Sequence, residues 1–216
     1  MQYTQIEWNS KEIIVGENVI DPIKPLQLLI GFHGAESTPE NILVHGNRLS
    51  LQNSAMAFPE GPIKTGQERF SWWKDGRKQK ETVEEFLNYC DDLIDQTHNY
   101  FKTANPKQQV QTSLWGFSQG ASAALVYALL GNRPIFKVAS VCGFLPEIPK
   151  PQAEKKNCAA ILGIFGANDE VIPSFLAEHA LEEMKKYGHQ STILKTPQGH
   201  EIRSENIKEI ENFFNC

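Results

Sequence analysis

A G-x-S-x-G run centred on Ser118 constrains this chain more than any other feature. It follows the β-rich segment Val110 to Trp115 and opens the Ala-rich helical segment Ala121 to Leu130, which is the strand-turn-helix setting of a nucleophile elbow. The chain has to reverse direction in almost no space, so a Cβ at Gly116 or Gly120 would collide with neighbouring backbone. We expect this turn to push the serine hydroxyl outward.

Two interpretations of the turn are open. In the first, Ser118 is a nucleophile, and the backbone N–H of Gln119 stabilises an oxyanion at a helix N-terminus, where the dipole favours negative charge. In the second, Ser118 only caps the helix. By composition alone a G-x-S-x-G run arises in roughly one chain in fourteen of this length. The rest of the sequence therefore has to decide between them.

The composition fits one globular domain over residues 1–216. Of the 216 residues 40% are hydrophobic and 22% are charged, which suits a sizeable core. The net charge of −5 gives no basic surface for nucleic acid, and no apolar stretch has the length of a membrane span. The four cysteines form no C-x-x-C pair, so without an export signal we expect free thiols and a cytoplasmic location. The composition does not predict the oligomeric state.

Strands and helices alternate along the chain. The first two expected strands form a half-exposed antiparallel pair at the sheet edge, and the third is a central strand covered on both faces. Residues 59–77 show neither a helical nor a strand period. The expected strands are 2–8, 12–16, 26–32, 55–58, 110–115, 136–142, 159–165 and 190–195, and the expected helices are 39–52, 80–101, 121–130, 173–187 and 204–214. This order predicts an α/β fold, a mainly parallel twisted sheet with helices on both faces.

A nucleophilic serine needs a base within hydrogen-bond reach, and that base needs an acid to hold it. In a parallel sheet such groups meet at the carboxyl ends of strands. Asp169 is the only aspartate after Ser118 and follows a buried strand. His200 follows the last strand, whereas His179 lies within a helical segment and His189 just past its end. We therefore expect Ser118, Asp169 and His200 to form a catalytic triad. The alternative is that His200 only caps the last helix. In that case the serine motif, the aspartate after a strand and the histidine after the last strand would occur in this order by coincidence.

A second oxyanion donor is expected from the turn after the early central strand. Gly34 lets the backbone turn there, and the N–H of Ala35 can then point toward Ser118. We interpret His33 as structural, since it precedes the serine in the chain and fits the base role badly.

Aromatic residues give the candidate substrate walls. Trp72 and Trp73 lie in the expected loop of residues 59–77, where they either anchor the loop or bind an apolar substrate group. We expect one of the two to point into the protein. Phe144 and Leu145, which follow another expected strand, are the other candidate walls of an open groove.

Together these motifs make the chain resemble the phospholipase/carboxylesterase family of α/β-hydrolases, which includes acyl-protein thioesterases and small bacterial carboxylesterases. The resemblance implies the Ser118, Asp169, His200 triad and oxyanion N–H groups from Ala35 and Gln119, with no metal or organic cofactor. Two departures fall on the substrate side: the family's His-Gly-x-Gly-Asp reads His-Gly-Ala-Glu-Ser here, and a lysine separates the second tryptophan from the next aspartate. The motifs that carry the resemblance are His33-Gly34, Ser71-Trp72-Trp73, residues 116–120, residues 142–146, residues 166–173 and residues 199–202.

We expect a serine esterase or thioesterase without a lid domain, acting on small-molecule esters with short to medium chains. One alternative is a hydrolase of another carbonyl substrate, such as a lactone or an amide. Another is a protein of the same fold that binds its ligand without turnover.

Overall fold

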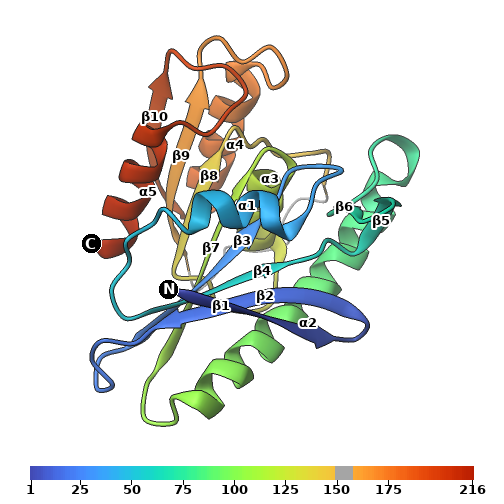
Figure 1. Cartoon of the computed structure of the whole chain (residues 1–216). Coiled ribbons are helices and arrows are strands. Elements are labelled where there is room, and N and C mark those ends of the chain that lie inside the picture. Colours follow the sequence, from blue (N-terminus) through green and yellow to red (C-terminus); the bar gives the residue numbers. More distant parts are fainter. Residues whose placement is uncertain (149–157) are drawn as a thin grey trace.

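An eight-stranded sheet runs through the molecule (Figure 1). The computed structural model describes residues 1–148 and 158–216. The strand order is β1-β2-β4-β3-β7-β8-β9-β10, antiparallel from β1 to β4 and parallel from there to β10. The strands are β1 (Gln2–Trp8), β2 (Lys11–Asn18), β3 (Leu26–Phe32), β4 (Ser54–Pro59), β7 (Val110–Phe117), β8 (Lys137–Val141), β9 (Ala160–Gly166) and β10 (Gln190–Thr196). The mainly parallel sheet and its antiparallel edge pair are confirmed.

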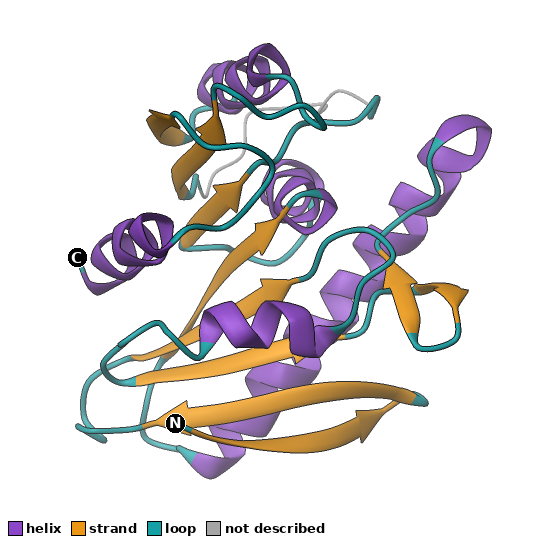
Figure 2. Cartoon of the chain, turned by 45° about the horizontal axis from the view of Figure 1, so that its top comes forward, coloured by secondary structure: helices purple, strands orange, loops and turns teal. Residues whose placement is uncertain are grey.

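Helices cover both faces of the sheet (Figure 2). Contacts place α1 against β3 and β4, and α5 against β8 and β9, on one face. On the other face α2 and α3 pack on β7, and α4 packs on β9 and β10. The helices are α1 (Pro39–Gly46), α2 (Gln79–Ala104), α3 (Gln119–Leu130), α4 (Ser174–Lys186) and α5 (Ser204–Asn215). The result is the three-layered α/β arrangement that the sequence predicts.

Two hydrophobic clusters fill the space between the layers. The larger one lies under α2, α3 and α4, and includes Phe32 and Phe86. The smaller one lies under α1 and α5, and includes Phe58 and Trp115. Helix α3 is buried along nearly its whole length, which explains why its sequence is apolar on every side.

Two predicted boundaries are wrong. Helix α1 ends at Gly46, six residues before the predicted end, where the backbone N–H groups of Arg48 and Leu49 bond the carbonyls three residues earlier and not four. The segment predicted as a loop without strands contains a hairpin of β5 (Ile63–Gly66) and β6 (Arg69–Ser71), followed by a 3₁₀ turn at Gly76–Lys78. The strands of this hairpin are short, mostly exposed and outside the main sheet, so they carry little hydrophobic signal.

The predicted loop after β8, residues 143–151, extends beyond residue 148 and is described only up to there. In the described ranges, no helix is both long and apolar enough to cross a membrane.

Candidate active site

The turn at residues 116–120 has the geometry of a nucleophile elbow. Strand β7 ends at Phe117, helix α3 begins at Gln119, and Ser118 between them has φ of 56° and ψ of −124°. A Cβ on Gly120 would lie 2.2 Å from the carbonyl oxygen of Phe32. On Gly116 it would lie 2.5 Å from backbone atoms of residue 120. Glycine is required at both positions because only backbone surrounds them, as the sequence predicts.

The hydroxyl of Ser118 faces a histidine rather than the helix. Ser118 occupies the N-cap position of α3 but its side chain makes no cap hydrogen bond. Instead its Oγ lies 2.9 Å from Nε2 of His200, and Nδ1 of that ring lies 2.8 Å from Oδ2 of Asp169. The three side chains come from the carboxyl ends of β7, β9 and β10. The structure therefore brings together the three residues that the sequence singled out.

The Asp169 carboxylate is held from both sides. Its side chain is 1% exposed, and Oδ1 accepts hydrogen bonds from the backbone N–H groups of Val171 (2.9 Å) and Ile172 (2.8 Å). Burial alone would raise the pKa of this carboxyl group, but the Ile172 N–H, the His200 ring and the Val171 N–H together lower it. An ionised Asp169 that accepts from Nδ1–H leaves the Nε2 lone pair of His200 free to face the serine hydroxyl.

Gln198 fixes the loop that carries His200, and the sequence analysis missed it. Its side chain is fully buried, donates to the carbonyl of Glu201 (2.8 Å) and accepts from Thr196 (2.8 Å) and from Asn206 of α5 (2.9 Å). Its own carbonyl accepts from the N–H of Asn168, which ties the histidine loop to the aspartate loop (3.1 Å). A buried amide two residues before His200 could be recognised only with the loop conformation in hand.

Cys142 lies beside the acid and was also missed as part of the site. Ligand-type atoms of Cys142, Asp169 and His200 lie within 4.8 Å of one another. Burial raises the pKa of the Cys142 thiol to about 12, and the nearby Asp169 adds to this. A metal ion binds the thiolate, so a protonated thiol at neutral pH fits a neighbour of the carboxylate better than a metal ligand.

The two predicted oxyanion donors come from the residue after Ser118 and from the turn after β3. Gln119 is the first residue of α3, so its N–H has no partner within the helix. Ala35 is exposed and lines the same cavity as Ser118 and His200. The turn that carries Ala35 is held at Glu36, which has φ of 51° and donates its N–H to Oγ of Ser71 (3.0 Å).

The indole rings of Trp72 and Trp73, which the sequence predicts as candidate groove walls, lie mostly in the core, although Trp73 also borders a hollow of about 450 Å³ beside Ala35 and Gln119. Trp72 is 0% and Trp73 1% exposed, and both rings pack edge-on against Phe86 in the larger cluster. The indole N–H of Trp72 donates to the carbonyl of His33 (2.7 Å), so burial of this ring leaves its polar atom paired. The loop turns its backbone, not its aromatic rings, toward Gln119, whose side-chain amide bonds the N–H of Trp72 and the carbonyl of Trp73.

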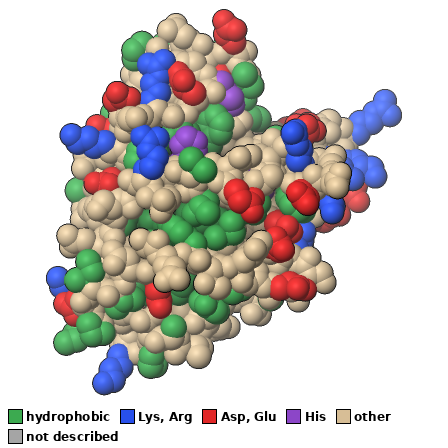
Figure 3. All heavy atoms as spheres, in the orientation of Figure 1, with side chains coloured by type: hydrophobic (Ala, Val, Ile, Leu, Met, Phe, Trp, Pro, Cys, Tyr) green, Lys and Arg blue, Asp and Glu red, His purple; other side chains and the backbone are tan. Residues whose placement is uncertain are grey.

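None of the four predicted substrate walls borders the cavity at the Ser118 hydroxyl. It measures about 520 Å³, and α1 forms one side of it. The predicted walls Phe144 and Leu145 are half-buried, but they do not line this cavity. On the face that α1 covers, hydrophobic side chains gather near the centre (Figure 3). The cavity is lined by His33, Gly34, Ala35, Ser37, Asn41, Ile42, Val44, His45, Phe117, Ser118, His200 and Ile202.

His33 is a buried, neutral residue of this site. Its Nδ1 lies 2.7 Å from the carbonyl oxygen of Gly34, and its ring stacks on Trp72. Burial lowers the pKa of His33 to about 4, although the Gly34 carbonyl and Glu40 act in the opposite direction. This agrees with the structural role expected from the sequence.

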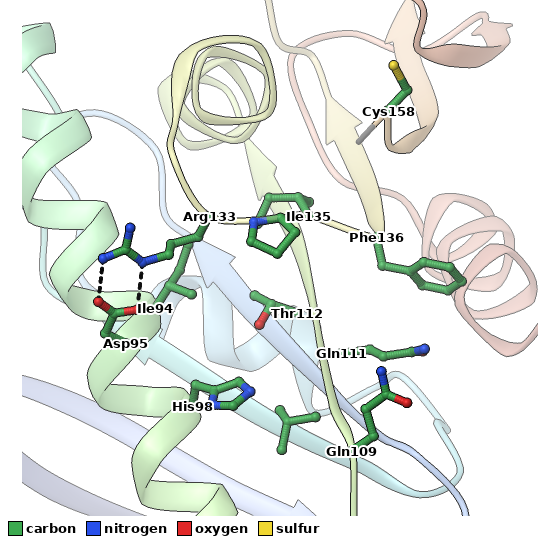
Figure 4. Close-up of a pocket in the computed structure, with 12 residues that line it drawn as sticks. Ile94, Asp95, His98, Gln109, Gln111, Thr112, Arg133, Ile135, Phe136 and Cys158 are labelled. Atoms are coloured by element: carbon green, nitrogen blue, oxygen red, sulfur yellow. Dashed lines mark hydrogen bonds and ion pairs between the residues drawn. The ribbon is translucent and has the colours of Figure 1, made fainter. Parts of the chain in front are cut away.

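A larger cavity of about 620 Å³ lies at the opposite edge of the sheet, at the amino ends of β7 and β8 (Figure 4). Arg133 at its rim donates two hydrogen bonds to Asp95, so the charges of both side chains are paired within the protein. None of the residues predicted for the site lines this cavity. Size alone does not identify the functional site here.

Solved structures similar to this chain are carboxylesterases and related proteins. An esterase named PE8 is 22% identical, with a TM-score of 0.71, and the match covers 92% of this chain and 95% of that one. A Bacillus cereus carboxylesterase is 13% identical, with a TM-score of 0.74 and 95% and 94% covered. Arabidopsis thaliana SOBER1 is 20% identical, with a TM-score of 0.69 and 88% and 97% covered. At these identities the likeness shows the fold, which is that of the α/β-hydrolases.

The sequence comparisons assign the family. A search of curated proteins gave no match. The model of the phospholipase/carboxylesterase family matches residues 16–216, which include the elbow, the aspartate loop and the histidine loop. The chain thus belongs to the phospholipase/carboxylesterase family and is a hydrolase with the α/β-hydrolase fold.

Proposed function

We propose that this protein is a serine carboxylesterase that hydrolyses short- to medium-chain carboxylic esters through an acyl-enzyme, and that acyl thioesters are also substrates. The observation that carries the proposal is the hydrogen-bonded series from Ser118 through His200 to Asp169. A serine hydroxyl is a weak nucleophile at neutral pH, and this arrangement is the one that activates it.

Each of the three side chains has a distinct role. His200 Nε2 takes the proton of Ser118 Oγ as that oxygen attacks the carbonyl carbon, and returns it to the leaving oxygen or sulfur. In the second half-reaction His200 takes a proton from water, which then attacks the acyl-enzyme. Asp169 holds the ring with Nδ1–H toward its carboxylate and stabilises the imidazolium that forms.

The backbone N–H groups of Ala35 and Gln119 stabilise the negative charge on the carbonyl oxygen. The N-terminus of α3 favours that charge, and Gln119 is its first residue. The bond from Trp72 to the carbonyl of His33 supports this proposal because it fixes the turn just before Ala35. No step of this mechanism uses a metal or an organic cofactor.

The remaining expectations from the sequence belong to the same proposal. A single domain over residues 1–216 and a cytoplasmic location both fit a small esterase. The four cysteines form no disulfide with one another, which supports the location.

A labelling experiment with Ser118→Ala tests the proposal. We expect a fluorophosphonate probe to label the wild type at Ser118, and the variant to lose both the label and several orders of magnitude in kcat. Ser50→Ala is the matched control, since Ser50 is exposed and lies outside the site. Circular dichroism and the melting temperature should be unchanged in both variants. Label retained by Ser118→Ala at another serine would refute the assignment.

A further inference from the structure

The chemistry of acylation fixes where the leaving group lies. This inference rests on the proposed function. Ser118 Oγ forms a bond to the carbonyl carbon, the bond from that carbon to the leaving oxygen or sulfur breaks, and the proton held on His200 Nε2 passes to the leaving atom. The leaving atom must therefore lie within hydrogen-bond reach of Nε2. The group attached to it occupies the space beside the His200 ring.

That space is the cavity of about 520 Å³ between α1 and His200, which both Ser118 and His200 line. Its far walls are apolar. Ile42 and Val44 come from α1, and Phe117 and Ile202 come from the segments next to the serine and the histidine. Val44 is 64% exposed, although it is an aliphatic residue on a helix that otherwise packs on the sheet.

The same cavity carries no fixed charge. None of the described residues that line it is Asp, Glu, Lys or Arg. Its two histidines other than His200 are shifted toward the neutral form: burial lowers the pKa of His33 to about 4, and burial followed by the charge of Arg48 lowers the pKa of His45. A charged leaving group would lose its hydration here without gaining a partner.

A second hollow near Ser118 has the opposite character. It measures about 450 Å³ and lies on the other side of Ala35, against the hairpin and the aromatic loop. Three charged residues line it, namely Glu36, Lys74 and Asp75, whereas Ser118 and His200 do not. The other lining residues are Ala35, Thr65, Ser71, Trp73 and Gln119. The apolar hollow is thus the one that adjoins the proton donor, and the charged hollow is not.

We propose that the cavity between α1 and His200 is the leaving-group site, and that it takes an uncharged aliphatic alcohol or thiol of several carbons. Val44 and Ile202 form the outer walls of this site, and Ile42 lies deeper. Selectivity for an apolar substrate therefore falls on the alcohol or thiol part of the ester.

Esters of one acid with alcohols of increasing length test this directly. Ethyl, butyl and hexyl acetate all form the same acetyl-enzyme, so differences in kcat/KM among them arise before deacylation. Because each buried CH₂ contributes about 0.8 kcal/mol, we expect kcat/KM to rise about fourfold per CH₂ up to the length that fills the cavity. A flat series would overturn the proposal.

An isomeric pair separates this site from general hydrophobicity. Hexyl acetate and ethyl hexanoate contain the same atoms and differ in which side of the ester carries the chain. We expect kcat/KM, measured by pH-stat below saturation, to be at least about tenfold higher for hexyl acetate. Equal values, or a preference for ethyl hexanoate, would overturn the proposal.

Two matched variants then locate the effect. Val44→Asp should reduce the rise from ethyl to hexyl acetate, whereas Ile20→Asp should leave it intact. Ile20 is also 64% exposed, but it lies between β2 and β3, away from the cavity. If kcat/KM rises as much from ethyl to hexyl acetate in Val44→Asp as in the wild type, Val44 is not a wall of the leaving-group site. If fluorophosphonate labels Ser118 but the preference is reversed, only the leaving-group site is wrong; if Ser118 is not labelled and no ester is cleaved, the proposed function itself fails.

Discussion

The nucleophile elbow and the aromatic loop carry similar sequence signals but differ in what they present at the surface. Each is a short cluster of distinctive residues that follows a strand. At the elbow the side chain of Ser118 points outward to His200, and the backbone around it is buried. In the aromatic loop Trp72 and Trp73 point inward, and the backbone bonds the amide of Gln119. One region presents the proposed nucleophile, and the other supports the turn next to it.

The difference follows from what limits each region. At the elbow backbone atoms lie within 2.5 Å of where a Cβ on Gly116 or Gly120 would stand, so this tight turn accepts only glycine at both positions. In the aromatic loop the orientation of the two tryptophan side chains follows from the burial of their large apolar rings. A motif that constrains the backbone is therefore a better guide to a site than one that only supplies a suitable side chain.

Replacement of Asp169, the predicted acid, gives the largest expected effect and tests the elbow side of the comparison. We expect Asp169→Asn to lower kcat on the order of 10⁴-fold, by analogy with serine proteases, because an amide at this position holds the wrong tautomer of His200. Steady-state kinetics with a soluble ester would measure this, with the melting temperature as the control for folding. Near-normal activity would return the acid role to a glutamate, and Glu170 would be the first to replace.

A methyl group at the elbow tests whether its geometry depends on backbone contact. Gly120→Ala should lower the free energy of unfolding by about 4 kcal/mol or more, or prevent folding, since the added Cβ would lie 2.2 Å from the Phe32 oxygen and 2.3 Å from the His33 oxygen. Gly66→Ala is the control, because the nearest atom there is 3.8 Å away, and it should change stability by less than about 0.5 kcal/mol. Urea unfolding of the three proteins compares them. Equal stabilities would contradict the crowding argument.

Truncation of a buried indole tests the inward-facing region. Trp73→Ala should lower the free energy of unfolding by roughly 3 to 5 kcal/mol, the usual loss for a large aromatic side chain in a core. Its kcat/KM values should keep the wild-type dependence on ester chain length, because the ring does not reach the substrate. Trp73→Phe serves as the milder variant if the first does not fold. A flattened chain-length dependence in either variant would place the ring in the groove after all.

Protonation of His33, the buried histidine just before the turn at Ala35, gives the smallest expected effect. The pKa of His33 is about 4 in the folded protein and near 6.5 in an unfolded chain. Between these values the unfolded state binds more protons, so stability is full above pH 6.5 and falls as the pH drops toward 4, by about 3 kcal/mol from this group. Urea unfolding at pH 7 and pH 4.5 should show a larger loss for the wild type than for His33→Asn. Parallel losses would mean that His33 is not buried and neutral.

Much of the architecture could be predicted because burial leaves a clear pattern. The central strand of residues 26–32 and the amphipathic helix α2 were evident from their apolar spacing. The hairpin β5–β6 was not, because its strands are short and lie outside the main sheet. The end of α1 was not either, since the sequence between Gly46 and the predicted end at Gln52 contains no proline or second glycine that would mark it.

For the site, chain order and the positions of the strand ends were enough to predict that Ser118, Asp169 and His200 lie together. The structure places the three side chains in hydrogen-bond contact. Their catalytic roles stay predictions until the variants are measured. The cavity walls could not be predicted, because they depend on which way α1 lies over the sheet. The support from Gln198 could not be predicted either, since its partners come from β10 and α5.

The bond from the Trp72 indole to the His33 carbonyl and the two bonds from the Gln119 amide to the aromatic loop connect both sides of the proposed oxyanion site before any substrate arrives. Donors that are already in place do not have to be ordered as charge develops, so little conformational entropy is lost on the way to the transition state. The temperature dependence of kcat should then reflect mainly an enthalpic barrier. Substitution of Trp72 by Phe would remove one of these connections, and its effect should appear as a more negative entropy of activation.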